Sequence, residues 1–272
     1  MDRGRDEYLL GMDPLEVARL GRQHEAWREP TARVLDAVGI RPGTTVVDLG
    51  CGPGFTTLEL ATRVGPEGRV VAVDASERAL AELGRRLERA GLRNVEPLRS
   101  EVLEADLSAV RPDVVFTRWL LCYLAEPGRL VARIASWLPP GGRFAAIDYW
   151  NYRAIHAEPP TPRFERVFRK VAESFAAAGG SLEVAGRLPA LCERAGLEVE
   201  RVEQLSPVAR PGEPLWLWVE EFLGLYLPKL VERGTLDPGE AAAHGEEWSE
   251  RAATPGALLF LPPVLGIVAR RP

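Results

Sequence analysis

Short apolar runs alternate with amphipathic stretches along most of the chain after residue 43. A short apolar run bounded by polar residues, glycine or proline is typical of a buried strand. Five such strands are predicted, at 44–49, 69–73, 95–99, 113–117 and 143–149. Most stretches between them repeat apolar positions every three or four residues, as in a helix that buries one face. Strands joined by single helices need right-handed crossovers, so the pattern predicts an open, mostly parallel sheet.

The regular alternation is interrupted near the start of the chain and by two insertions. Residues 13–39 predict two helices, the first capped by Asp13 and the pair separated by Pro30. Helices are further expected at 161–179, near 188–195 and within 211–256, and strands at 197–202 and 264–270. The predicted division is a helical lid segment at 1–39, a core at 40–150, helical lid insertions at 151–180 and 205–260, and the end of the core sheet at 181–204 and 261–272.

Composition limits the partner and the compartment. Lys plus Arg number 34 and Asp plus Glu number 39, so the net charge is −5, which disfavours a dedicated nucleic-acid binder. Cys51, Cys122 and Cys192 are far apart and form no CxxC pair, so we expect neither a disulfide framework nor a metal site. The charged start and the interrupted apolar stretches predict a cytoplasmic protein that does not enter a membrane.

The most informative segment runs from Val46 to Gly54, where a strand leads through a glycine-rich turn straight into a helix. Glycines let the backbone turn sharply and approach a ligand closely. A dinucleotide fingerprint would place its third glycine at the position of Phe55, whereas the spacing here is G-x-G-x-G. Asp48 stands two residues before the first glycine. A carboxylate at that point suits a cationic ligand better than a pyrophosphate.

A second acid lies at the tip of the next strand. Asp74 follows the apolar run 70–73 and can accept hydrogen bonds from both hydroxyls of a ribose. Together, the glycine-rich turn after Asp48 and the strand-terminal Asp74 resemble the class I S-adenosylmethionine (SAM)-dependent methyltransferases. The resemblance covers roughly residues 40–150. It implies a doubly wound, mostly parallel, Rossmann-like seven-stranded α/β sheet with a helical lid, and S-adenosyl-L-methionine as the cofactor.

The resemblance also implies roles for single residues. The glycine loop would lie under the methionine and ribose, Asp48 would hold the amino end directly or through water, and Asp74 would hold the ribose diol. In the family the third strand usually ends in Gly-Asp-Ala or similar, whereas this chain has Ser100-Glu101-Val102, and Glu101 would reach the adenine amino group with a longer side chain. The expected cofactor-binding residues are Tyr8, Gln23, Asp48, Gly50, Cys51, Gly52, Gly54, Asp74, Ala75, Glu101, Val102 and Arg118.

Aromatic residues predict the side of the site that takes the methyl acceptor. Trp119 follows the fourth strand and Tyr149 ends the fifth, where the topology directs both to the crevice. The expected substrate-binding residues are Trp119, Tyr149, Tyr152 and His156. A second aromatic group recurs at helical spacing, which is more typical of core packing than of a site. Its members are Trp216, Trp218, Phe222 and Tyr226.

No general base is assigned, because methyl transfer needs one only when the acceptor must lose a proton. His24 and His156 are candidates for a role in the site, whereas His244 lies in a polar segment and is expected at the surface. Asp148 ends the fifth strand and faces the crevice by topology, yet a carboxylate there is as often structural.

The predicted function is SAM-dependent methyl transfer to a small, hydrophobic or aromatic molecule at O, N or C, by a monomer or homodimer. A SAM-binding sensor without catalysis and a nicotinamide-dependent reductase are the alternatives, which methyl-transfer and NADH-binding assays separate. Nucleic acid as a substrate is disfavoured. Enzymes that methylate the amino group of a base carry an acid or amide followed by Pro-Pro and an aromatic residue after the fourth strand, where this chain has Thr117-Arg118-Trp119-Leu120. Enzymes that methylate C5 of cytosine use a cysteine that generally follows a proline, whereas Cys122 follows Leu121.

Overall fold

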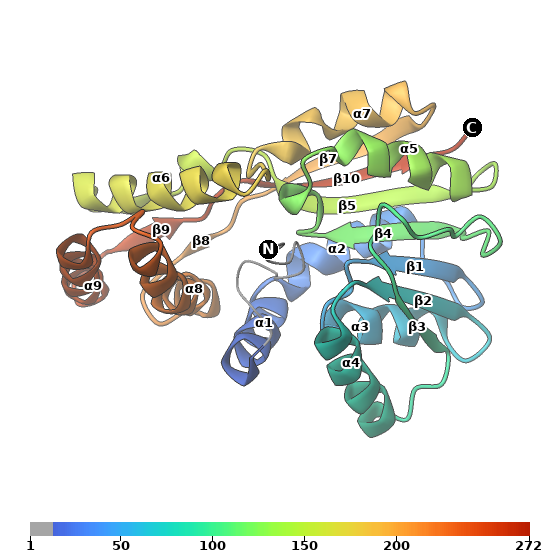
Figure 1. Cartoon of the computed structure of the whole chain (residues 1–272), viewed down its shortest axis with the longest axis horizontal. Coiled ribbons are helices and arrows are strands. Elements are labelled where there is room, and N and C mark those ends of the chain that lie inside the picture. The colour runs from blue at the N-terminus through green and yellow to red at the C-terminus, as the bar shows by residue number, and fades with distance from the viewer. Residues whose placement is uncertain (1–12) are drawn as a thin grey trace, which may run out of the picture.

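The computed structural model describes residues 13–272, and its central element is a seven-stranded sheet (Figure 1). The strand order is β3-β2-β1-β4-β5-β10-β7, in which β1 to β5 are parallel and β10 is antiparallel to both of its neighbours. The strands are β1 Thr45–Leu49, β2 Arg69–Asp74, β3 Val95–Arg99, β4 Val114–Arg118, β5 Arg143–Tyr149, β7 Glu198–Leu205 and β10 Val264–Arg270. This architecture confirms the predicted mostly parallel, Rossmann-like sheet. Its order reverses between β1 and β4, where open α/β sheets bind their ligands.

Burial explains why the apolar runs form strands and where the sheet ends. In the central strands β1 and β4, four residues each are buried, and in β5 the five interior residues are buried. The edge strands β3 and β7 are mostly exposed or half-buried and carry several charged side chains. Charged edge strands resist pairing with other chains.

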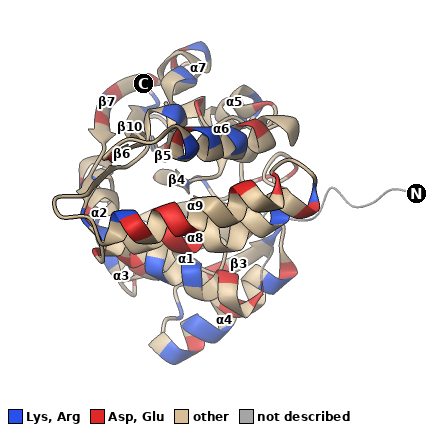
Figure 2. Ribbon diagram, turned by 90° about the vertical axis from the view of Figure 1, so that its left-hand side faces the viewer, with Lys and Arg blue, Asp and Glu red and all other residues tan. Residues whose placement is uncertain are grey.

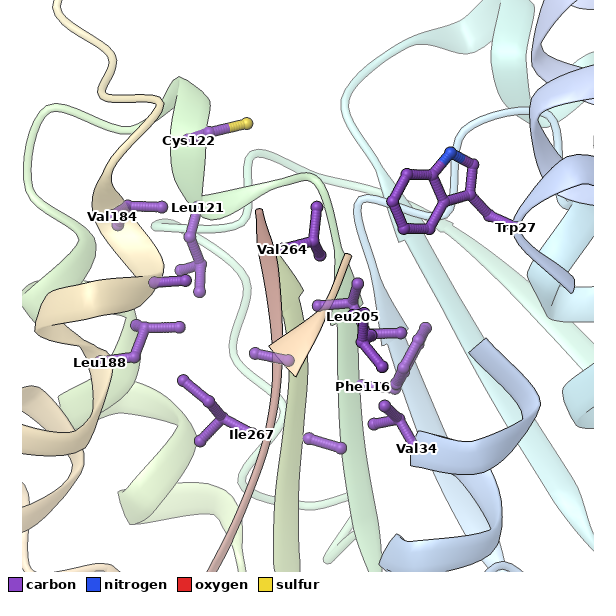
Figure 3. Close-up of a cluster of buried hydrophobic side chains, with 14 of the residues drawn as sticks. Trp27, Val34, Phe116, Leu121, Cys122, Val184, Leu188, Leu205, Val264 and Ile267 are labelled. Atoms are coloured by element: carbon purple, nitrogen blue, oxygen red, sulfur yellow. The ribbon is translucent and has the colours of Figure 1, made fainter. Parts of the chain in front are cut away.

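Within residues 13–272, five helices pack beside the sheet. They are α2 Arg28–Val38, α3 Phe55–Val64, α4 Glu77–Ala90, α5 Pro127–Trp137 and α7 Leu188–Arg194, with short 3-10 turns η1 Leu121–Tyr123, η2 Tyr152–Ala154 and η3 Val184–Arg187. Helix α2 contacts β5 and β10, α3 contacts β1 and β2, and α4 contacts β2 and β3. Apolar side chains cover the sheet on both sides, with Val34 of α2 on one side and Leu188 of α7 on the other (Figure 3).

The remaining helices gather beyond the carboxyl ends of the parallel strands (Figure 1). They are α1 Pro14–Ala26, α6 Pro162–Ala177, α8 Pro214–Glu232 and α9 Pro238–Ala252, and we call these four helices the lid. Helix α8 contacts both α1 and α9, and α9 contacts α6. A three-stranded antiparallel sheet joins the lid to the core, with β6 His156–Glu158, β9 Leu258–Phe260 and β8 Val208–Ala209 in that order.

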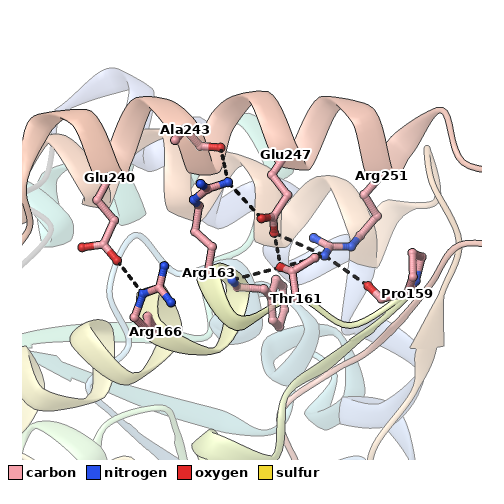
Figure 4. Close-up of polar contacts among 9 residues, drawn as sticks. Pro159, Thr161, Arg163, Arg166, Glu240, Ala243, Glu247 and Arg251 are labelled. Atoms are coloured by element: carbon pink, nitrogen blue, oxygen red, sulfur yellow. Dashed lines mark hydrogen bonds and ion pairs between the residues drawn. The ribbon is translucent and has the colours of Figure 1, made fainter.

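Ion pairs connect α6 to α9 (Figure 4). Glu247 of α9 accepts hydrogen bonds from Arg163 Nη1 at 3.2 Å, from Arg251 Nη2 at 3.3 Å and from the Thr161 hydroxyl. A separate pair joins Arg166 to Glu240 at 3.1 Å. Arg251 is only 3% exposed, so this network lies partly inside the lid, where charge-assisted hydrogen bonds are strongest.

His244 corrects one expectation, because it is buried in the lid and not at the surface. Only 2% of the residue is exposed, and its ring lies 6.4 Å from that of Phe164 on α6. The residues of α9 at 244, 248 and 251 share one helical face, and that face packs against α6. A segment rich in Ala, Gly and Glu therefore contributes a buried face that its composition conceals.

Two details of the chain differ from the sequence prediction. The first two helices meet at Trp27, and Pro30 lies inside the first turn of α2, where proline is tolerated. The small sheet of β6, β8 and β9 was not predicted, because strands of two or three residues are too short to show a hydrophobic period.

Acidic and basic residues are interspersed along the helices of the face in Figure 2 rather than separated into patches. Within residues 13–272, none of the helices combines the length and apolar character that a membrane crossing requires.

Candidate active site

The loop after β1 has a backbone that requires glycine. Gly50, Gly52 and Gly54 have φ values of 68°, 55° and 84°, in the left-handed region. A Cβ atom on Gly54 would lie 2.2 Å from Leu83 Cδ1, and one on Gly50 would lie 2.8 Å from Leu120 Cδ1. A Cβ on Gly52 would meet nothing within 4 Å. Two of the glycines therefore permit close packing, whereas the third borders open space in which a ligand can approach the backbone.

Asp74 connects the tip of β2 to this loop. Its Oδ2 accepts a hydrogen bond from the Gly52 N–H at 2.8 Å, and its Oδ1 accepts one from the Ser76 N–H at 2.8 Å. Partial burial raises the pKa of the Asp74 carboxyl, and the two hydrogen bonds oppose that rise. Each carboxylate oxygen keeps a second lone pair. The two motifs identified in the sequence are thus in direct contact, and Asp74 can still accept hydrogen bonds from a diol.

Asp48 is buried beneath the loop, with an exposed fraction of 3%. Its Oδ2 accepts a hydrogen bond from the Thr57 hydroxyl at 2.6 Å, which joins β1 to α3. Burial raises the pKa of Asp48 to about 6, and Thr57 and the positive charge of Arg118 oppose the rise. The carboxylate therefore has little surface for direct contact with a ligand.

Arg118 ends β4 and holds two residues of the first two helices. Its guanidinium donates to Thr31 Oγ1 at 3.1 Å and approaches His24 Nδ1 at 3.3 Å, and it lies 5.0 Å from the ring centroid of Trp119. Burial lowers the pKa of Arg118 to about 10, still high enough to keep it charged.

His24 lies between Arg118 and the glycine loop, with its ring stacked on that of Phe55 at 5.9 Å. Burial, followed by the nearby charge of Arg118, lowers the pKa of His24 to about 4, so the ring is neutral near pH 7. An arginine can only donate, so Nδ1 accepts and the proton of the neutral ring sits on Nε2. His24 therefore cannot remove a proton from a substrate while Arg118 holds it.

The aromatic side chains predicted for the acceptor side form one stack. The ring of Trp119 lies 6.2 Å from that of Tyr149 and 6.1 Å from that of Trp218, both stacked, and 5.4 Å from Trp27 at a right angle. Trp119 adopts a φ of 51°, which is strained for a bulky residue. Strain of this kind persists only where the surroundings hold the residue in place, as the stack does here.

A cavity of about 570 Å³, part of it open to solvent, lies beside this stack. Its lining is mostly aromatic, with one charged side chain and one amide. The lining residues are Arg19, Gln23, Trp119, Tyr123, Tyr149, Tyr152, Ile155, Phe168, Phe175, Leu182, Trp218, Val219, Phe222 and Pro262. Burial raises the pKa values of Tyr149 and Tyr152, so both phenols stay protonated near pH 7.

A buried polar network closes the cavity between α1 and α8. Arg19 donates to both oxygens of Glu16, at 2.8 and 2.6 Å, and to Gln23 Oε1 at 2.8 Å. Gln23 Oε1 also accepts from Trp218 Nε1 at 2.8 Å. Arg19 and Glu16 are 2% and 1% exposed, so their charges neutralise each other inside the protein.

The other residues predicted to bind the cofactor differ in their exposure. Tyr8 lies outside the described residues. Glu101 is exposed and Val102 buried after β3, while Ala75 is exposed after β2, and Cys51 is a buried free thiol within the glycine loop. These positions follow neighbouring strands at one edge of the sheet.

On the acceptor side, Trp119, Tyr149 and Tyr152 line the cavity, but His156 does not. The ring of His156 lies on β6 against Phe260, at 6.1 Å, and its side chain is 44% exposed.

Most of the lining residues were not assigned to the site from the sequence, and two of them, Trp218 and Arg19, take part in its polar network. Trp218 was expected in the core; it is 5% exposed, but it also lines the cavity. Arg19 was not singled out, although Glu16, Arg19 and Gln23 are spaced three and four residues apart and so share one face of α1. That spacing was the signal available in the sequence.

Asp148 lies next to the stack, but its carboxylate oxygens are engaged by hydrogen bonds from backbone N–H groups. It is 1% exposed, and its oxygens accept hydrogen bonds from the N–H groups of Cys122 at 3.1 Å and Tyr149 at 2.9 Å. Burial raises the pKa of Asp148 to about 7. Within residues 13–272, His, Cys, Asp and Glu side chains do not gather in threes as a metal site would require.

Comparison with known proteins places this geometry in a family. The model of a family described as "Methyltransferase domain" matches residues 40–194, which is more than half of the chain. The chain is 30% identical over 226 residues to an uncharacterized 37.1 kDa protein in transposon TN4556 of Streptomyces fradiae, covering 78% of this chain and 62% of that protein. It is 28% identical over 127 residues to the demethylmenaquinone methyltransferase of Bacillus cytotoxicus, covering 47% of this chain and 52% of that enzyme.

A solved structure extends the similarity to almost the whole fold. A putative methyltransferase from Bacillus halodurans has a TM-score of 0.58 and 18% identity, covering 89% of this chain and 98% of that one. At this identity the likeness concerns the fold alone. The chain spans 62% and 52% of the lengths of the two curated relatives. From the family match and the fold, we conclude that the chain belongs to the class I SAM-dependent methyltransferase family.

Proposed function

We propose that this protein transfers a methyl group from S-adenosyl-L-methionine to a small, hydrophobic or aromatic molecule. The observation that carries the proposal is the position of two surfaces at the carboxyl ends of the parallel strands. The glycine loop and Asp74 form one surface, and the aromatic cavity around Trp119 and Tyr149 forms the other. A nucleoside cofactor on the first surface and an apolar acceptor in the second would be neighbours, as a displacement reaction requires.

The residues at the loop fit the cofactor. Open space borders Gly52, Asp74 keeps lone pairs for a ribose diol, and Glu101 and Val102 follow the adjacent strand, where the resemblance puts the adenine. When bound, SAM supplies an electrophilic methyl group on a positively charged sulfur.

The protein's own contribution is to position the acceptor and keep water away from it. Trp119, Tyr149 and Trp218 form rigid apolar walls. The lining residues within 13–272 include neither a carboxylate nor an imidazole, and His24 is held by Arg118. The acceptor would therefore react as a neutral nucleophile or after losing its proton to solvent.

Calorimetric titration with SAM and with NADH, followed by transfer of labelled methyl to a panel of small aromatic acceptors, tests the proposal. We expect SAM binding, no NADH binding and label in an organic product. SAM binding without transfer, while a control methyltransferase turns over, would indicate the sensor. NADH binding without SAM binding would indicate the reductase.

A matched pair of glycine variants sharpens the test of the cofactor site. Gly52 and Gly43 both have left-handed φ values, 55° and 85°, and a Cβ on either would meet nothing within 4 Å. Because only Gly52 lies in the proposed site, Gly52→Ala is expected to weaken SAM binding about 10-fold and Gly43→Ala to leave it unchanged. Equal affinities of the two variants would contradict the placement of the cofactor.

A further inference from the structure

The indole N–H of Trp119 is a buried donor without a partner among the described residues. Trp119 cannot easily turn to find one, because its ring stacks with those of Tyr149 and Trp218 and its backbone is strained. An unsatisfied buried N–H is costly and requires an explanation. The indole nitrogens of Trp27, Trp150 and Trp216 are also unpartnered, but these residues do not line the cavity, whereas Trp119 does.

Gln23 offers a second donor on the same lining. Both hydrogen bonds that the structure describes for Gln23 use its oxygen, which accepts from Arg19 Nη1 and from Trp218 Nε1. Because both partners can only donate, the orientation of the amide is determined, and its NH₂ group is the donor that remains.

The charges around the cavity point to the same class of ligand. Arg19 lines the cavity, and Arg118 lies 5.0 Å from the Trp119 ring. Glu16 pairs with Arg19, and both of its carboxylate oxygens accept hydrogen bonds from Arg19. The lining residues of 13–272 therefore offer an ammonium group no carboxylate, because the carboxylate of Glu16 is already paired with Arg19.

We propose that the acceptor molecule carries a lone-pair oxygen, as a phenol, phenolate or carbonyl, on a largely apolar body, and that this oxygen binds Trp119 Nε1 and the Gln23 amide. An ammonium ion has no lone pair to accept from these two donors, so we expect the cationic form of an amine to bind more weakly than an oxygen compound of the same apolar size. The inference rests on the proposed methyl transfer, since it specifies the substrate of that site.

The test compares three probes of similar apolar size on the complete chain saturated with S-adenosylhomocysteine. The probes are naphthol, naphthalene and the naphthylmethylammonium ion, and the readout is the dissociation constant from fluorescence titration. We expect naphthol to bind most tightly and the ammonium ion most weakly. Tighter binding of the ammonium ion, or no binding of naphthol, overturns the inference.

Three variants identify the donor. Trp119→Phe keeps an aromatic ring but removes the N–H, so naphthol should bind about 10-fold more weakly while naphthalene binding stays within about 2-fold. Trp150→Phe removes an unpartnered N–H outside the cavity and should change neither. Gln23→Glu replaces the amide donors with a carboxylate that can still accept from Trp218, so the preference should shift from naphthol toward the ammonium ion.

The outcomes separate this inference from the proposed function. If neither SAM nor S-adenosylhomocysteine binds, the proposed function fails whatever the probes do. If the cofactor binds and Trp119→Phe weakens naphthol and naphthalene equally, only the oxygen anchor is wrong.

Discussion

The glycine loop and the lid build the two halves of the proposed site in different ways. The loop brings Gly50, Gly52 and Gly54 together within five residues of sequence, and Asp74 reaches it from the adjacent strand. The lid brings together residues far apart in the chain, since Gln23 and Trp218, which share a hydrogen bond, are 195 residues apart. The loop's shape therefore follows from local backbone requirements, whereas the cavity exists only if α1 and α8 pack correctly.

The largest expected effect is on the lid, through the buried Glu16–Arg19 pair. Glu16→Gln leaves the Arg19 charge buried without its charged partner, which should lower the free energy of unfolding by about 3–5 kcal/mol. Glu25→Gln is the matched control, because Glu25 of α1 and Arg28, the first residue of α2, form a pair of the same sequence spacing. Their side chains are 65% and 67% exposed, so that pair is worth at most about 0.5 kcal/mol. Hydrogen exchange should show faster opening of α1 and α8 in Glu16→Gln only. Equal exchange in the two variants would contradict a lid held by its buried pair.

The second effect is on the loop. A Cβ on Gly54 would clash with Leu83, which is fully buried and cannot move aside, and the left-handed φ adds strain. Gly54→Ala should therefore lower the free energy of unfolding by about 3 kcal/mol. Gly43→Ala introduces the same backbone strain without a clash, so it should lower the free energy of unfolding by only about 1 kcal/mol. Urea unfolding measures both, and similar losses would show that the clash is relieved elsewhere.

The third effect separates cofactor binding from stability. Asp74→Ala removes an acceptor expected to bind the ribose, so SAM affinity should fall by about 2 kcal/mol, roughly 30-fold. Asp106→Ala, at an exposed position, should leave the affinity unchanged. Calorimetric titration with SAM measures both variants, and unchanged affinity in Asp74→Ala would remove this residue from the cofactor site.

The smallest effect is a pH dependence at the junction of the two regions. The pKa of His24 falls from 6.5 to about 4 on folding, so below pH 6.5 the unfolded chain binds more protons than the folded one. This contribution to stability is complete above pH 6.5 and is lost as the pH falls toward 4. Between pH 7.5 and 5.5 it should amount to about 1 kcal/mol.

His24→Gln should remove that part of the acid sensitivity. The difference in unfolding free energy between pH 7.5 and 5.5 should then be about 1 kcal/mol smaller than in the unchanged protein. His244, buried in the lid with its pKa also lowered to about 4, should contribute a similar part independently. An unchanged pH dependence in His24→Gln would show that its ring is exposed to solvent protons in the folded state.

The sequence predicted the core closely because its signals are local. The buried run of β5 and that of β10 were predicted with the observed bounds. The lid was predicted as helices but not as a surface. His244 was wrongly expected at the surface, and Trp218 was expected only in the core, because a polar or aromatic helical pattern does not reveal which neighbour will cover it.

By itself, the sequence determined the succession of strands and helices along the chain, the glycine loop and the acid at the tip of β2. Each of these depends on backbone conformation or on a hydrophobic period within one segment. Only the tertiary structure decided that Arg19, Gln23, Trp119 and Trp218 meet around one cavity. Their meeting depends on how α1 and α8 dock above the sheet. That docking is a balance of long-range packing and buried hydrogen bonds that no short stretch of sequence records.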